Sequence, residues 1–397
     1  MEEWKEIIIG DLGTIITGKT PKTSIIENYG GEIPFLTPSD DMSFRSAPKT
    51  KKTITQIGLS EVRNCLLPKG AICISCIGSD LGKVVITQQE TVTNQQINSI
   101  VPKDCYDVDF IYYLMLIIGK ELNRLSKTST AVPIINKSTF SNTRISVPSL
   151  KVQKRISSIL KSLDDKIENN RKINENLEQQ AQALFKSWFV DFEPFRNQPF
   201  AESELGMIPE GWRVGTLGDI TTQQINRVDQ NQDIKVLSPV TTGKLMLSEE
   251  YFTKQVFSES IAKYKIVEIG DFAYNPARVN IGSLGRNEYK FRGCVSPVYV
   301  VFSCKEGYEK FFDYFRKTDV FKTEVNSRAI GGVRQSLNYS DFVLIQSIIP
   351  PQNIANSFGD ICSHISEMQK HNESESHCLS QLRDTLLPKL MSGEIKL

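Results

Sequence analysis

The chain of 397 residues contains an internal duplication, and this feature most limits the folds open to it. A shift of 202 residues aligns 135–189 with 337–391 without a gap. Nearer the start of each copy the offset is 208, and in the middle it is 200, as insertions in the loops of a common scaffold would produce. A unit of about 200 residues therefore occurs twice. Identical pairs include Asn136 with Asn338, Phe140 with Phe342, Pro148 with Pro350, Asn170 with Asn372, and Leu184 with Leu386.

The first two thirds of each copy has the pattern of an α+β domain. Short apolar runs separated by Gly, Pro and Asn predict strands, for example at Lys69–Ile74, Lys83–Ile86 and Pro297–Phe302. Helices are expected at Asp109–Leu125 and Tyr308–Val325. The fold class predicted for the chain is α+β, with two tandem domains that are each followed by a long helix.

The last third of each copy changes to a helical period, because apolar residues now recur at steps of four and three. A sustained repeat of this kind predicts a coiled-coil seam. In the first copy the seam positions are Leu160, Leu163, Ile167, Asn170, Leu177, Leu184 and Trp188. In the second copy they are Ile361, Ile365, Met368, Asn372, Glu375, Leu379, Leu382 and Leu386.

Two such helices of matching length are expected to pack against each other as an antiparallel coiled coil. Asn170 and Asn372 would then either pair and fix the register or remain as tolerated polar residues in a partly exposed seam. A helix of 40 residues is about 60 Å long, so the two domains would lie at opposite ends of a rod of about that length. The predicted division is a first domain at 1–150, a central helix at 151–193, a linker at 194–211, a second domain at 212–350 and a C-terminal helix at 351–397.

The composition, 40% hydrophobic and 23% charged, is that of an ordinary soluble globular protein. No apolar run is long enough to span a bilayer, and the acidic start Met1–Lys5 does not resemble a signal peptide, so a cytoplasmic protein is expected. The formal net charge is only +1. Any contact with nucleic-acid phosphates must therefore come from local basic clusters and not from a global field.

Several motifs suggest enzymes or metal sites, but their contexts argue against them. Gly13–Thr20 fits the phosphate-binding pattern GxxxxGK[ST], yet its four middle residues favour a strand, and Pro21 disfavours the helix that must follow. Cys73 and Cys76 form a CxxC inside an apolar run, where buried thiols are expected. All three histidines lie in the last forty residues, without a second pair of metal ligands. The chain is therefore expected to hold no metal and to have no catalytic residues.

Basic residues cluster instead in loops of the two domains, in the company of Asn, Gln and Gly. Arg pairs well with guanine, and Asn or Gln with adenine, so such loops suit base recognition. The alternative is a solvated surface without a partner. The candidates for DNA contact are Lys19, Arg45, Lys49, Lys51, Lys52, Lys83, Arg227, Arg278, Asn280, Arg286, Arg292, Arg328, Arg334 and Gln335.

Some longer stretches resemble a known family. They are Gly18–Pro21 with Tyr29–Asp40, then Leu163–Leu177 with Ala183–Phe192, then Ile208–Trp212, and finally Leu382–Glu394. Together they resemble the specificity subunits of type I restriction–modification enzymes. The first stretch is similar to the start of a target recognition domain in that family, and it accounts for the GxxxxGK[ST] pattern.

The resemblance implies a function. Each domain would read one half of a split sequence in double-stranded DNA, and the helices would set the distance between the halves. Two methylation subunits would bring S-adenosylmethionine, and restriction subunits would use ATP and Mg²⁺. This chain would bind no cofactor itself. Asn226–Asp229 departs from the motif of the first copy, which implies unlike half-sites, and Pro388 should bend or end the second helix.

Two alternatives remain open at this point. One is a nucleotide-binding enzyme built on Gly13–Thr20, and the other is a coiled-coil assembly protein.

Overall fold

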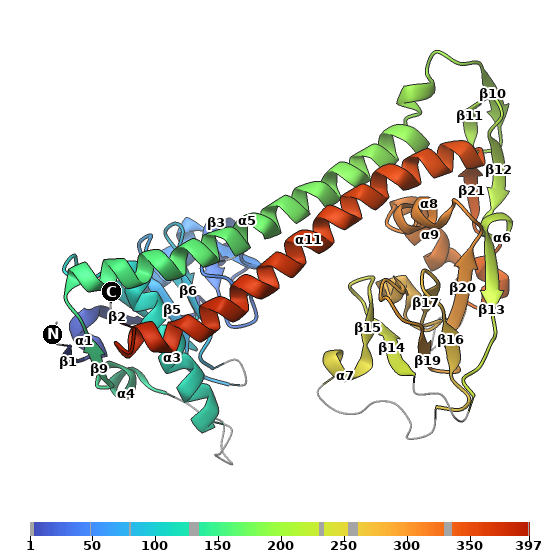
Figure 1. Ribbon diagram of the computed structural model, residues 1–397. Coiled ribbons are helices and arrows are strands. Elements are labelled where there is room, and N and C mark those ends of the chain that lie inside the picture. The colour runs from blue at the N-terminus through green and yellow to red at the C-terminus, as the bar shows by residue number, and fades with distance from the viewer. Residues whose placement is uncertain are drawn as a thin grey trace. The chain divides into compact units, whose positions relative to one another are not determined.

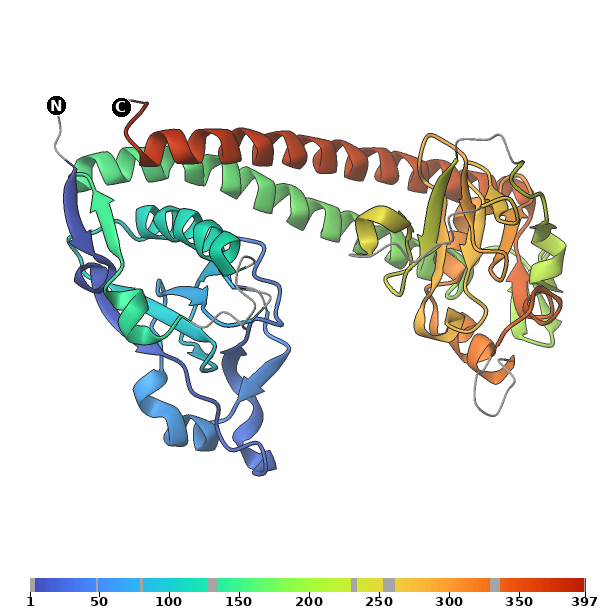
Figure 2. The ribbon, with the colours of Figure 1, turned by 90° about the horizontal axis from the view of Figure 1, so that it is seen from below.

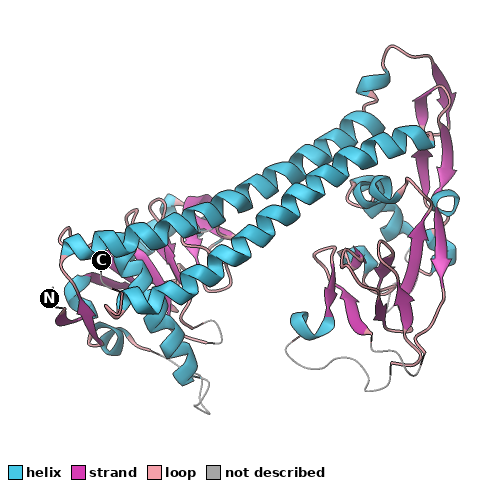
Figure 3. Cartoon of the chain, in the orientation of Figure 1, coloured by secondary structure: helices cyan, strands magenta, loops and turns pink. Residues whose placement is uncertain are grey.

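The computed structural model describes residues 4–47, 49–78, 81–126, 135–229, 234–252, 261–328, 336–395 and 397 (Figure 1). The chain forms two compact units. Unit 1 consists of Met1–Ile173 together with His371–Leu397, and unit 2 is the continuous segment Asn174–Lys370. Both are mixtures of helices and strands, as Figure 3 shows. The α+β class predicted from the sequence is confirmed.

Unit 1 is built on a four-stranded antiparallel sheet in the order β2-β8-β5-β6. A smaller sheet, β4-β3-β7, pairs β3 with β7 in parallel, and a ribbon joins β1 to β9. The strands are β1 (Lys5–Ile8), β2 (Gly13–Thr17), β3 (Tyr29–Leu36), β4 (Lys52–Ile54), β5 (Ile72–Ser75), β6 (Val84–Ile86), β7 (Val92–Thr93), β8 (Ile97–Pro102) and β9 (Arg144–Val147).

The helices of unit 1 include one long element that packs on the main sheet. This helix, α3 (Val108–Ser126), contributes Phe110, Tyr113 and Met115 to the core, all fully buried. The shorter helices are α1 (Ile9–Leu12), η1 (Ile26–Asn28), α2 (Gln56–Val62), η2 (Arg63–Cys65) and α4 (Lys137–Ser141).

Unit 2 repeats this plan with sheets in the orders β13-β20-β17-β18 and β15-β14-β19-β16, a ribbon β12-β21 and an added hairpin β10-β11. Its strands are β10 (Phe200–Ser203), β11 (Gly206–Pro209), β12 (Arg213–Thr216), β13 (Thr221–Gln224), β14 (Lys235–Pro239), β15 (Leu245–Leu247), β16 (Lys265–Val267), β17 (Phe272–Tyr274), β18 (Leu284–Arg286), β19 (Gly293–Val295), β20 (Val300–Cys304) and β21 (Gln346–Ile349). Its shorter helices are η3 (Glu193–Phe195), α6 (Leu217–Ile220), α7 (Ser248–Tyr251), η4 (Val279–Ile281), α8 (Glu309–Phe315), α9 (Asp319–Arg328) and α10 (Tyr339–Phe342).

The elements recur at the same offsets as the sequence repeat. β9 and β21 are separated by 202 residues, β5 and β17 start 200 apart, and α1 and α6 lie 208 apart. In both units a parallel strand pair lies in the second sheet, β3 with β7 and β14 with β19. The duplication inferred from the sequence is therefore a duplication of the fold, and the drift in offset falls in the loops.

One helix predicted from the sequence differs from the one in the structure. The single helix predicted at Tyr308–Val325 is two helices, α8 and α9, separated at Arg316–Thr318. The backbone turns at this point because Thr318 is held to Phe315: its N–H and its hydroxyl both donate to the Phe315 carbonyl, at 3.0 and 2.7 Å. Thr318 Oγ1 then accepts from the Phe321 N–H at 3.3 Å, which starts α9.

Two long helices, α5 (Leu150–Phe189) and α11 (Gln352–Met391), are 40 residues each. In unit 1 the start of α5 and the end of α11 lie side by side (Figure 2). They share one core, because Leu160, Leu387 and Leu390 belong to the same cluster. In unit 2 the end of α5 and the start of α11 do the same. Residue numbers rise along one helix as they fall along its neighbour, so the pair is an antiparallel coiled coil.

The helix α11 differs from expectation in two ways. It passes through Pro388 and ends at Met391, because a proline in the last turn removes only one terminal hydrogen bond. At three of the predicted seam positions, moreover, the residue that faces inward is the next one along the helix. Met368 and Leu382 are 52% and 47% exposed, while their neighbours Gln369 and Arg383 form polar contacts across the helix pair. Ile361, also predicted there, is 40% exposed. Glu375 is half-buried.

Of the CxxC residues, Cys73 lies in β5 and is fully buried, and Cys76 directly follows that strand and is 2% exposed. Burial raises the pKa of the Cys73 thiol to about 12, which suppresses thiolate chemistry. Across the described ranges no group of three or more His, Cys, Asp or Glu side chains is placed to hold a metal ion. Nor does any helix in those ranges have the length and apolar character needed to cross a membrane.

Candidate nucleic-acid interface

The GxxxxGK[ST] motif does not form a phosphate-binding loop. Its first half is the strand β2, and Gly18 to Thr20 form an irregular loop that does not lead into a helix. Gly18 is required for packing, because a Cβ there would lie 2.2 Å from Thr93 Oγ1. Lys19 projects from this loop with its side chain exposed, beside a hydrogen bond of 2.8 Å between Thr20 and Gln95. The motif therefore presents a cation on a fixed loop.

A second basic segment in unit 1 is anchored by the buried carboxylate of Asp40. One oxygen of Asp40 accepts from the N–H and hydroxyl of Thr37 at 2.8 and 3.0 Å, which fixes the turn after β3. The other oxygen accepts from the Lys51 N–H at 2.8 Å. Lys49, Lys51 and Lys52 are exposed on the backbone held in this way. Sequence reasoning identified the lysines but missed the carboxylate that positions them.

Two other candidates in unit 1 are less exposed than these lysines. Arg45 is only 14% exposed and forms ion pairs with Asp109 at 3.1 Å and Asp165 at 3.6 Å. Lys83 is half-buried where the β5–β6 turn closes, and its N–H donates to Ser75 Oγ at 2.9 Å. The Arg45 charge therefore holds α3 and α5 together and is not presented to solvent.

The cluster at Arg278, Asn280, Arg286 and Arg292 is spread over separate turns of unit 2. Arg278 and Arg292 are exposed, and Asn280 is half-buried in η4. Arg286 differs from these, because its Nε donates to the Gly270 carbonyl at 3.1 Å and its guanidinium lies 5.8 Å from the Phe272 ring centroid. Arg286 packs against the protein, while the other two cations face solvent.

The remaining candidates in unit 2 also differ in their surroundings. Arg328, at the end of α9, pairs with Glu324 at 3.1 Å. Arg227 is exposed, and its strand partner is Lys265, a half-buried cation that sequence reasoning missed. The proximity of the two could not be read from a separation of 38 residues. Arg334 and Gln335 lie outside the described residues.

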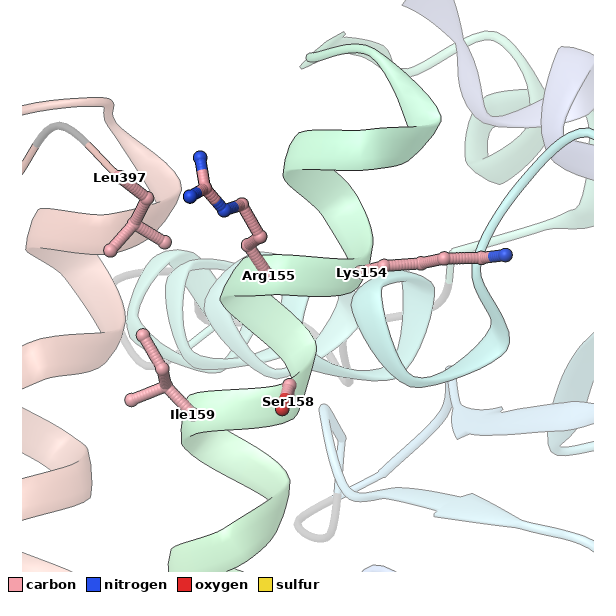
Figure 4. A pocket seen from close by; sticks show the side chains of 5 residues that line it. All are labelled: Lys154, Arg155, Ser158, Ile159 and Leu397. Atoms are coloured by element: carbon pink, nitrogen blue, oxygen red, sulfur yellow. The ribbon is translucent and has the colours of Figure 1, made fainter.

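Two surface pockets accompany these loops. In unit 1, a pocket of about 410 Å³ lies between Lys154, Arg155, Ser158 and Ile159 of α5 and the C-terminal Leu397 (Figure 4). Arg155 points toward Leu397, whereas Lys154 points to the other side of the helix. In unit 2, a pocket of about 390 Å³ is lined by η4 and α9, and its Arg316 is already paired with Asp313 at 2.7 Å. Neither pocket brings together an acid, a base and a nucleophile.

The seam between the long helices contains buried polar links as well as apolar contacts. In unit 1, Asn170 is 1% exposed, and its Nδ2 donates to Glu375 Oε2 at 2.7 Å and to the backbone carbonyl of Asn372 at 3.4 Å. In unit 2, Asn174 and Gln369 each donate to the other's carbonyl, at 3.0 and 3.1 Å. The Asn170 side chain therefore contacts Asn372 through the Asn372 backbone carbonyl. Its hydrogen bond to the Glu375 carboxylate is shorter than this one.

Most of the seam residues named from the sequence lie buried or half-buried, whereas Ile361, Met368 and Leu382 are exposed. Buried are Leu160, Asn170 and Leu177, and half-buried are Leu163, Ile167, Leu184, Trp188, Ile365, Asn372, Leu379 and Leu386. The sequence did not reveal the buried Asp164. One of its oxygens accepts from Tyr113 Oη at 2.7 Å and the other from Arg383 Nη1 at 2.8 Å, so it joins α3, α5 and α11 within unit 1.

Comparison with known proteins agrees with this arrangement. The family described as type I restriction modification DNA specificity domain matches residues 1–179. The MjaIX specificity subunit of a type I restriction enzyme from Methanocaldococcus jannaschii is 31% identical over 415 aligned positions, which cover 100% of this chain and 94% of that protein. The chain belongs to the type I restriction–modification specificity subunits.

Other members of the family share parts of the chain. The HindI specificity subunit of Haemophilus influenzae is 36% identical over 175 residues, covering 42% of this chain and 38% of that protein. A crystal structure of the type I S subunit from M. genitalium covers 98% of this chain and 96% of its own, with a TM-score of 0.56 and 15% sequence identity. Specificity subunits are non-catalytic and bind DNA in a sequence-specific manner, so the nucleotide-binding enzyme is discarded.

One buried carboxylate in unit 2 of this specificity subunit makes its stability depend on pH. Burial raises the pKa of Asp271 to about 6, although its carboxylate accepts the Glu268 N–H at 3.1 Å. The pKa of Asp271 in the folded state lies above its value in the unfolded state. The group therefore contributes most to the stability of unit 2 below about pH 4, and this contribution is lost as the pH rises through about 6.

We expect Asp271→Asn to remove this dependence, because the amide keeps an acceptor for Glu268 but carries no charge. Near pH 7.5 the substitution should raise the free energy of unfolding by about 2 to 3 kcal/mol, and near pH 4 the difference from wild type should become small. Urea unfolding of both proteins at the two pH values measures it. An equal difference at both would show that the charge of Asp271 is not the cause.

Proposed function

We propose that the two units of this specificity subunit each read one half of a split DNA target, and that the long helices set the spacing between the halves. The observation that carries this proposal is the duplicated fold with dissimilar loops. The framework elements recur in the same order at offsets of 200 to 208 residues, whereas Gly18–Pro21 in one copy is replaced by Asn226–Asp229 in the other. Unlike loops on like frameworks favour a target whose halves differ.

We also propose the subunit's partners and their cofactors. Two methylation subunits would dock on the helices and domains and use S-adenosylmethionine, and restriction subunits would add translocation and cleavage driven by ATP and Mg²⁺. This chain would bind none of these cofactors and would determine only which DNA sequence the complex binds. The complex would act in the cytoplasm, where the chromosome lies. Outward-facing apolar residues on α11, Met368 and Leu382, are compatible with protein contacts along the helix.

A domain exchange tests the two-reader proposal. Replacing residues 1–149 by the corresponding segment of another specificity subunit leaves both long helices intact, because α5 begins at Leu150. We expect the methylated motif in the host genome to change in one half only, with the other half and the spacing unchanged. Replacing 212–350 is the reciprocal control and should change the other half. A change of both halves by one exchange would contradict the proposal.

A further inference from the structure

Two cations occupy directly opposed positions on neighbouring backbone segments of unit 2. Arg227 and Lys265 form an antiparallel bridge. The flanking hydrogen bonds run from the Val228 N–H to the Tyr264 carbonyl at 2.9 Å and from the Ile266 N–H to the Asn226 carbonyl at 2.8 Å. This pattern makes the two cations a non-hydrogen-bonded pair, the kind in which opposed side chains lie closest and leave the strands on the same face.

The pairing is electrostatically unfavourable for the protein alone, because like charges directly opposite each other destabilise a strand pair. Burial lowers the pKa of Lys265, and the positive charge of Arg227 lowers it further. Within the described ranges neither residue forms an ion pair with a carboxylate. Asp229 is exposed two residues beyond Arg227 and makes no ion pair in those ranges either. An anion from outside the chain would supply a countercharge that the described residues do not provide.

The two side chains are also positioned to share one anion. Lys265 is half-buried, and its Nζ donates one hydrogen bond to the Tyr299 carbonyl at 2.6 Å, which fixes the ammonium group; its two other N–H donors have no partner among the residues that the structure describes. Arg227 is exposed and brings a planar guanidinium that matches phosphate oxygens. One half-buried cation held in place and one exposed cation on the same strand face suit a phosphate of an extended polymer.

We propose that Arg227 and Lys265 clamp a single backbone phosphate of the DNA half-site read by unit 2. The inference rests on the proposed function, since it requires DNA to lie on this unit. A phosphate contact fixes the position of a domain on the duplex without reading its sequence. The pair therefore sets the register of unit 2 on its half-site, while other loops read the bases.

The test compares the assembled complex carrying wild-type chain with complexes carrying Arg227→Gln, Lys265→Gln or both. Duplex binding is measured by fluorescence anisotropy over a range of salt concentrations, on the motif identified by methylation mapping and on an unrelated duplex. The double variant should bind both duplexes about tenfold more weakly, with the slope of log Kd against log salt reduced by about 0.9, the value for one phosphate. The methylated motif should stay the same.

Control variants distinguish a phosphate contact by these two residues from an effect on folding and from the general loss of positive charge. Lys322→Ala removes an exposed cation of the same unit that is already paired with Asp319 at 3.1 Å, so it should leave affinity and slope unchanged. Arg227→Lys with Lys265→Arg should retain most of the binding. The double Gln variant should be at least as stable as wild type in urea, because its repulsion is relieved.

Three results would overturn the clamp: an unchanged salt slope in the double variant, an altered methylated motif, or displacement of the duplex by ATP that depends on these two residues. The last would assign the pair to a free nucleotide. Failure of the proposed function itself looks different, since the wild-type complex would then show no preference for the mapped motif over the unrelated duplex.

Discussion

Asp164→Ala should destabilise unit 1 by about 3 to 5 kcal/mol, the usual effect of removing one partner from a buried ion pair. Asp164 is 7% exposed and accepts from Tyr113 at 2.7 Å and from Arg383 at 2.8 Å. Its loss leaves the buried Tyr113 phenol without its acceptor, and it takes from the Arg383 guanidinium the buried one of two carboxylate partners, Asp384 being the exposed other one. Because a chain of two units need not unfold in one step, hydrogen exchange of peptides from α3 is the appropriate measurement, and protection there should fall sharply.

The neighbouring residue provides a matched control. Asp165 carries the same charge, but its side chain is 55% exposed and its contact with Arg45 is a looser 3.6 Å, so Asp165→Ala should cost less than about 1 kcal/mol. Asp164→Leu combined with Arg383→Met replaces both charges by apolar groups and should recover most of the lost stability. Equal effects of Asp164→Ala and Asp165→Ala would refute the role assigned to the buried carboxylate.

Phe358→Ala should destabilise unit 2 by a similar amount, about 3 to 5 kcal/mol, because it removes a large ring from a close-packed core. Phe358 is fully buried at the start of α11. Its ring centroid lies 5.0 Å from that of Phe189, 5.8 Å from that of Phe185 and 5.7 Å from that of Tyr314. The substitution therefore opens a cavity where α5, α8 and α11 meet.

Hydrogen exchange again distinguishes the units, and peptides from α8 and β20 should lose protection while those from β5 and β8 should not. Ile361→Ala, three residues further along α11, is the control, since that side chain is 40% exposed and the change should cost little. Phe358→Leu should fall between the two. Loss of protection throughout the chain in Phe358→Ala would show that the effect is not confined to the core of unit 2.

The sequence predicted the parts of the fold that depend on local pattern and on repetition. The duplication, the α+β class, the strands near Ile72 and Val84, and the two long helices are all visible in periodicity or in self-alignment. The error at Tyr308–Val325 arose because the hydroxyl of Thr318, which begins the second helix there, has no signature in hydrophobic spacing. Nor could the pattern resolve which of two adjacent positions on α11 faces its partner, because polar residues occupy the inward face.

Site residues were harder to predict, because their environment depends on segments far apart in the chain. Arg45 belongs to a basic run, yet it is engaged by Asp109 and Asp165, which no local pattern reveals. Lys265 stands alone in the sequence and becomes notable only beside Arg227. Asp164 and Arg383 are separated by 219 positions, and only the antiparallel register brings them together.

The division of the long helices between the units has a consequence for the order of events during synthesis. Unit 2 is one continuous segment, whereas the core of unit 1 includes Leu387, Leu390 and Met391 at the far end of the chain. A polypeptide emerges from the ribosome starting at its N-terminus. The core of unit 1 is therefore begun before unit 2 is synthesised and completed only after it, because Leu387, Leu390 and Met391 leave the ribosome later than Lys370.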